Sequence, residues 1–174
     1  MPLHCACGSS FDVHHALTCK KSGFVIRRHN EIRDITAKLL SEVTKDVEVE
    51  PELIALTGEE MHHATSKTND EVRLDIAASD FWVKGQRSYF DVRVFDPNAK
   101  KHQHLQLKRC YQLNENEKKR HYNERIQRVD QGSFSPLVFS LAGGMAPEAR
   151  VFYGRLSEKL ALKRNVEMNM INMD

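Results

Sequence analysis

Two aspartates in short apolar segments are the residues of this chain best suited to chemistry. Asp75 lies in the segment RLDIA (73–77) and Asp91 in the segment FDVRV (90–94), with fifteen residues between them. A hairpin of that length sets two strands side by side, so we expect the two carboxylates to meet at one sheet edge. Paired carboxylates are ligands for a hard divalent cation such as Mg²⁺ or Mn²⁺. Such a site is used for metal-assisted cleavage of a phosphodiester.

A second group of chemical residues lies near the N-terminus. Three of the four cysteines fall within the first 19 residues, in the spacing C-x-C-x7-H-x3-C formed by Cys5, Cys7, His15 and Cys19. Three thiolates and one imidazole complete a tetrahedral Zn²⁺ site, which can replace a core in a small module. The adjacent His14 is an alternative to His15, and unliganded cysteines are the alternative to zinc. Nothing in the sequence indicates the oxidising compartment that disulfides need.

Composition restricts the class of protein. The 174 residues are 40% hydrophobic with a net charge of +2, which suits one domain with a small appendage. The sequence has neither a long apolar run nor a secretory signal pattern, so we expect a nuclear or intracellular protein with no membrane partner. Residues 100–130 carry nine Lys or Arg against four acids. This local excess favours contact with a phosphate backbone, and a solvated helix face is the alternative.

Hydrophobic periodicity, proline and glycine predict the elements that would position these residues. In chain order we expect a helix at 28–43, strands at 47–51, 72–78 and 88–95, a helix at 104–130, a strand at 135–140 and a helix at 147–164. A polar loop is expected at 57–71. The order α-β-β-β-α-β-α predicts an α/β (α+β) fold, with a mixed sheet flanked by helices.

These elements divide the chain into three parts. We expect residues 1–22 to form a zinc knuckle, residues 23–164 to form the main domain, and residues 165–174 to be a frayed or truncated tail.

Taken together, the motifs and their order resemble a known family. The chain is similar to the C-terminal region of site-specific non-LTR retrotransposon polyproteins, where a cysteine-histidine knuckle precedes a restriction-like endonuclease of the PD-(D/E)XK class. The resemblance spans about residues 5–164, and the motifs after the knuckle are RHN (28–30), EP (50–51), RLD (73–75), DVR (91–93) and Lys118-Lys119 with Tyr122.

Three positions depart from the family pattern. Leu74 replaces a proline that is not a ligand, Asn30 replaces an aspartate, and Arg93 replaces the lysine of the strict motif. Arginine stays protonated, so Arg93 cannot serve as a general base, although it can stabilise charge on a phosphate. The family places the catalytic lysine in the next helix, which points to Lys118 or Lys119 without choosing between them.

The resemblance implies a function and a set of roles. Asp75 and Asp91, with the Val92 carbonyl and Glu50, would hold Mg²⁺, while Arg93 and Lys118 or Lys119 would act on the scissile phosphate. The partners implied are double-stranded target DNA, element RNA and a covalently linked reverse transcriptase. The residues expected to contact DNA are Arg27, Arg28, His29, Arg33, Arg73, Arg120 and Tyr122. The alternatives are a DNA-binding module without cleavage and a structural remnant of a decayed element.

Overall fold

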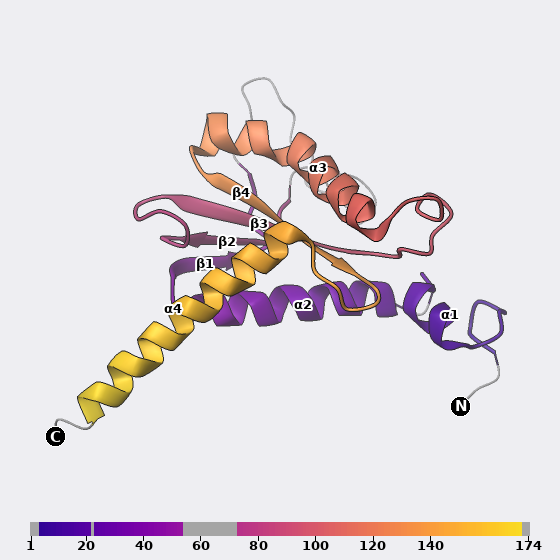
Figure 1. Ribbon diagram of the computed structural model, residues 1–174, viewed down its shortest axis with the longest axis horizontal. Coiled ribbons are helices and arrows are strands. Elements are labelled where there is room, and N and C mark those ends of the chain that lie inside the picture. Colours follow the sequence, from indigo (N-terminus) through magenta and orange to yellow (C-terminus); the bar gives the residue numbers. More distant parts are fainter. Residues whose placement is uncertain (1–3, 22, 54–72, 172–174) are drawn as a thin grey trace.

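A computed structural model describes residues 4–21, 23–53 and 73–171 of the chain, with side chains up to residue 166. A short helix precedes a main body of helices and strands (Figure 1). In chain order the elements are α1 (Val13–Thr18), α2 (Phe24–Ser41), β1 (Lys45–Val49), β2 (Ile76–Ser79), β3 (Arg87–Phe95), α3 (Leu107–Arg125), a π-helical turn (Ile126–Asp130), β4 (Ser133–Ser140) and α4 (Pro147–Ile171).

The four strands form one mixed sheet in the order β1-β2-β3-β4. The pairs β1–β2 and β2–β3 are antiparallel, whereas β3 and β4 are parallel. A parallel pair needs a long crossover, and α3 with its π-helical turn provides it. The hairpin β2–β3 is the one expected from the spacing of the two aspartates.

Helices cover both faces of the sheet. The larger core joins α2 and α4 to one face, through residues such as Leu40, Phe90 and Phe152. On the other face, α3 and the π-helical turn pack against the sheet through two smaller clusters that include Tyr89, Tyr122 and Phe95. Figure 1 shows α3 on one side of the sheet, with α2 and α4 on the other. Alternate residues of β3 therefore face different helices, and the odd-numbered ones face α3.

The predicted element order α-β-β-β-α-β-α is confirmed for the main body, and the bounds shift by a few residues. The sequence patterns missed α1, which is only six residues long. Its Asp12 N-cap accepts a hydrogen bond from the His15 backbone N–H at 2.6 Å, a capping signal that precedes the helix in the sequence. The predicted loop at 57–71 lies outside the described residues.

The last helix is longer than the sequence patterns predict. Helix α4 continues to Ile171, seven residues beyond its predicted end. The sequence there has no proline or glycine to stop a helix. In the described parts of the chain, none of the helices combines the length and apolar composition that a membrane crossing requires.

Candidate active site and metal centre

Three acidic residues stand in one row across the sheet. Val49 pairs with Ile76, and Ile76 pairs with Phe90. One residue further along this register, Glu50 lies beside Asp75 and Asp75 beside Asp91. The hydrogen bond from the Glu50 N–H to the Asp75 carbonyl, at 2.9 Å, continues the register past the ends of the strands. On this row Asp91 faces α3, where it contacts Lys118. Asp75 and Glu50 instead contact side chains of α2.

Helix α3 places a lysine on this row. The Nζ of Lys118 lies 2.8 Å from Oδ2 of Asp91. The same Nζ lies 5.6 Å from the centre of the Tyr122 ring, one helical turn further along α3. Lys118 is therefore held between an aromatic face and a carboxylate.

Asp91 is a buried carboxylate whose pKa differs from its ordinary value. Its residue is only 5% exposed. Burial raises the pKa of Asp91 to about 6, because the nearby Lys118 charge, which favours ionisation, only partly offsets the loss of solvent. The neighbouring Asp75 carboxylate raises the pKa further. Lys118 is the charge partner of the buried Oδ2 at 2.8 Å, and among the described residues this oxygen accepts no hydrogen bond of regular geometry.

Asp75 binds the backbone of the next strand. Its Oδ2 accepts a hydrogen bond from the Val92 N–H at 2.5 Å, one residue before β2 begins at Ile76. The Nε2 of His29, on α2, lies 3.2 Å from the same Oδ2 and 3.0 Å from the Val92 carbonyl oxygen. The hydrogen bond to Asp75 raises the pKa of His29, although burial acts in the opposite direction.

Glu50 is engaged by two arginines. Its carboxylate pairs with Arg33 of α2 and, at 3.2 Å, with Arg73. Glu50 also has a left-handed backbone, with φ of 56°, which ends β1. Each acid of the row therefore has its own basic partner: Arg33 and Arg73 at Glu50, His29 at Asp75, and Lys118 at Asp91.

Other predicted site residues of α3 and β3 point elsewhere. Lys119 pairs with Glu148 at the start of α4, and Arg93 pairs with Glu117 at 3.0 Å. Tyr122 is 4% exposed and packs against Phe134, so it lies in the core and not on a surface that DNA can reach. The partners Glu117 and Glu148 were not predicted as site residues, since only the packing of α3 on the sheet brings them close.

Arg120 lies on the exposed side of α3. Its Nε donates to the Asn116 carbonyl at 3.3 Å, which is a contact within the helix. Its guanidinium lies on the helix surface, where contact with a partner is sterically open.

The N-terminal Cys and His residues converge as the spacing predicts. The ligand atoms of Cys5, Cys7, His15 and Cys19 all lie within 4.8 Å of one another. The Sγ atoms of Cys5 and Cys19 are 3.7 Å apart, and Cys7 Sγ lies 3.2 Å from His15 Nε2. A hydrogen bond with the Ser9 side chain is the largest contribution lowering the pKa of Cys7 to about 6, which favours the thiolate that a metal needs.

This group fits a zinc ion. Four ligands at about 2.3 Å from a tetrahedral centre lie about 3.8 Å apart, close to the Cys5–Cys19 separation. Among residues 4–21, Cys19 is the only buried side chain, so this segment has almost no core of its own to hold its shape. His14 points away and contacts Asp96 at 3.2 Å, which leaves His15 as the histidine ligand.

In the described ranges, this is the one set of three or more His, Cys, Asp or Glu side chains that converges enough to share an ion. The carboxylates of Glu50, Asp75 and Asp91 do not converge to that degree.

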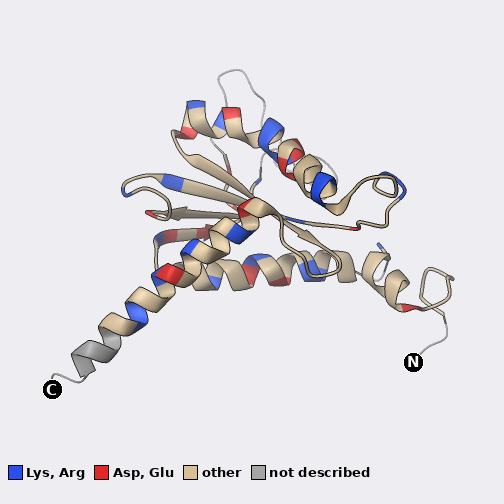
Figure 2. Cartoon of the chain, viewed as in Figure 1, with Lys and Arg blue, Asp and Glu red and all other residues tan. Residues whose placement is uncertain are grey.

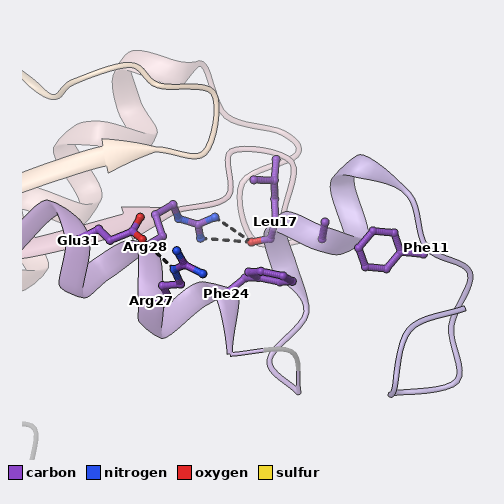
Figure 3. Close-up of a pocket in the computed structure, with 7 residues that line it drawn as sticks. Phe11, Leu17, Phe24, Arg27, Arg28 and Glu31 are labelled. Atoms are coloured by element: carbon purple, nitrogen blue, oxygen red, sulfur yellow. Dashed lines mark hydrogen bonds and ion pairs between the residues drawn. The ribbon is translucent and has the colours of Figure 1, made fainter. Parts of the chain in front are cut away.

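The knuckle is joined to α2 by a direct contact. Both terminal nitrogens of Arg28 donate to the Leu17 carbonyl at 3.2 Å (Figure 3). Arg27 is exposed and pairs with Glu31 at 2.8 Å. These contacts border a hollow of about 380 Å³ lined by Phe11, Ala16, Leu17, Phe24, Arg27, Arg28 and Glu31. The predicted DNA contact Arg28 is thus held against the knuckle.

Basic side chains are spread over several elements. Figure 2 shows Lys and Arg on α3, on the loop that follows β3 and along α4, interspersed with acids. Four of the cations predicted for residues 100–130 are exposed together on that loop and the first turn of α3: Lys100, Lys101, Lys108 and Arg109. The loop begins near Asp96, which contacts His14 of the knuckle. The knuckle and these cations therefore lie at the same end of the sheet.

No protein-family model matches this chain, and no curated protein matches it at a significant level.

Proposed function

We propose that this chain is a metal-dependent DNA endonuclease domain of the restriction-like, PD-(D/E)XK type from a retroelement. The observation that carries the proposal is the 2.8 Å contact between Lys118 and Asp91 in a row of carboxylates shared with Asp75. An acid pair on adjacent strands with a lysine from the following helix supplies the charges that phosphodiester hydrolysis needs.

The oxygen donors of this row suit a hard cation. The carboxylates of Asp75 and Asp91 and the Val92 carbonyl would hold Mg²⁺ or Mn²⁺, and the Asp91 oxygen that lacks a hydrogen-bond donor fits this assignment. The cation would lower the pKa of an attacking water and polarise the scissile phosphate. Glu50, which pairs with Arg33 and Arg73, would add a third carboxylate beside Asp75.

The protein's own groups would position and stabilise the reacting atoms. Lys118 would orient the water or stabilise negative charge that develops on the phosphate. Arg93, which remains protonated, would act only through its charge. Lys119 pairs with Glu148 instead, so we do not assign this role to it.

Binding of target DNA would use the exposed cations at the knuckle end of the sheet. Lys100, Lys101, Lys108 and Arg109 would contact phosphates, together with Arg27 and the knuckle. By the resemblance, the product is a nick whose 3′-hydroxyl primes a linked reverse transcriptase on element RNA. The zinc would be structural, because a closed four-ligand site has no open position for chemistry.

A DNA-binding module that does not cut is the second candidate. It is favoured by Arg93 in place of lysine and by the basic side chain that already contacts each acid of the row.

Two assays on the zinc-loaded protein separate the candidates. The first measures nicking of supercoiled plasmid with and without added Mg²⁺ or Mn²⁺, and the second measures DNA binding as a function of salt. Metal-dependent nicking supports the endonuclease. Salt-sensitive binding without nicking supports the binding module, and the absence of both leaves a structural remnant.

A further inference from the structure

His29 has a position that the endonuclease proposal does not use. Its Nε2 lies between two oxygens that come from different strands, 3.0 Å from the Val92 carbonyl and 3.2 Å from Asp75 Oδ2. A carbonyl and a carboxylate are both acceptors, so Nε2 must carry the hydrogen. One imidazole N–H therefore links two oxygens of the candidate site.

These two oxygens are also proposed ligands for the divalent cation. Mg²⁺ binds oxygen at about 2.0–2.1 Å, which is shorter than either hydrogen bond of His29. A cation bound to both oxygens would take the space into which the Nε2 hydrogen points. The imidazole contact and a shared cation are therefore mutually exclusive.

We propose that His29 is a placeholder that holds the Asp75 and Val92 oxygens in the metal-free protein and that a divalent cation must displace. This inference rests on the proposed function. His29 is a positioning residue in this role, because it acts on the ligands and not on the substrate.

The surroundings favour His29 as the group that moves. Its side chain is 32% exposed, compared with 21% for Lys118 at Asp91. At Glu50, which supplies neither of the two oxygens, Arg33 is 12% and Arg73 58% exposed. His29 also lies near the start of α2, beside Arg28, so its ring can leave the row without disturbing the sheet. The Val92 N–H remains on Asp75 and keeps the carboxylate in place.

The test is the affinity of the zinc-loaded, full-length chain for Mn²⁺, measured by isothermal titration calorimetry without DNA. The variants are His29→Ala and His29→Asn, since an asparagine is too short to link both oxygens. Asp75→Asn serves as the variant with an impaired site. His104→Ala, at an exposed position of the loop after β3, is the control for loss of a histidine.

We expect both His29 variants to bind Mn²⁺ about tenfold more tightly than wild type, because two hydrogen bonds no longer compete with the cation. His104→Ala should match wild type, and Asp75→Asn should bind more weakly. Unchanged or weaker binding by the His29 variants, with binding retained by wild type, would overturn the placeholder role and leave the metal site intact. No binding by any of the proteins would overturn the proposed metal site and this inference together.

Discussion

Lys118 of α3 reaches Asp91 of β3 at 2.8 Å, whereas its neighbour Lys119 reaches Glu148 of α4. Successive residues on a helix point about 100° apart, so only one of two adjacent lysines can face the carboxylate row. The packing of α3 on the sheet therefore assigns the two lysines to different partners.

This difference predicts different effects of alanine substitution. Lys118→Ala should reduce the rate of plasmid nicking by about 10²–10³-fold, the effect of losing a group that stabilises charge in the transition state. Lys119→Ala should reduce it by less than about threefold, because Lys119 only forms a partly exposed ion pair. Rates are measured at saturating DNA. Equal losses in both variants would contradict the assignment.

Asp75 should have a structural role that is separable from its charge. Asp75→Ala leaves the buried Val92 N–H without its acceptor and should lower the free energy of unfolding by about 1–3 kcal/mol. Asp75→Asn keeps an acceptor oxygen and should lower it by less. Urea unfolding of the zinc-loaded proteins gives both values. Both variants should fail to nick DNA, and equal destabilisation by the two would argue against the hydrogen bond.

The raised pKa of Asp91, about 6 against an ordinary 3.8, predicts a pH dependence of stability. Between these two values the folded protein binds more protons than the unfolded chain. The contribution of Asp91 to stability is therefore fully present below about pH 4 and is lost as pH rises through about 6. The Asp91→Asn variant has no carboxyl group to titrate at this position and should not lose this stability. The difference in the free energy of unfolding between the variant and wild type should therefore shift in favour of the variant by about 1–2 kcal/mol from pH 5 to pH 8.

Urea unfolding of both proteins at the two pH values measures this difference. Because both share the zinc knuckle, the effect of pH on zinc binding largely cancels. If the stability of Asp91→Asn relative to wild type stays constant or falls with rising pH, the pKa of Asp91 is not raised by burial, and this prediction is wrong.

The two adjacent histidines of the knuckle should behave differently toward zinc. His15→Ala removes one of four converging ligands and should lower zinc content well below one ion per chain. His14→Ala removes only the contact with Asp96 and should keep one zinc. Elemental analysis gives the zinc content, and the absorption spectrum of the cobalt-substituted protein reports tetrahedral thiolate ligation. Zinc retained by His15→Ala but lost by His14→Ala would reverse the assignment.

Much of the site could be predicted from local patterns. Apolar alternation and the spacing of Asp75 and Asp91 predicted the hairpin, and the spacing of Cys5, Cys7 and Cys19 predicted the knuckle. The choices between His14 and His15, and between Lys118 and Lys119, could not be made from the sequence. Each depends on how a helix is rotated against distant residues, which local patterns do not encode.

The ion pairs of the row were also beyond sequence reasoning. Arg33 and Glu50 are 17 residues apart, and His29 and Val92 are 63 apart. Their contacts arise because α2 packs across the end of the sheet where the acids stand. Helix α4 was predicted too short, although residues 165–171 contain no proline or glycine to stop a helix.

The central claim is that Asp75, Asp91 and Lys118 form a metal-dependent nuclease site. The most direct measurement is conversion of supercoiled plasmid to nicked circles by zinc-loaded wild type and Asp91→Ala, at equal DNA occupancy, with and without added Mn²⁺. We predict nicking by wild type only when Mn²⁺ is present, and none by Asp91→Ala although it still binds DNA. Equal nicking by both proteins, or no nicking by a folded wild type that binds DNA, would contradict the account.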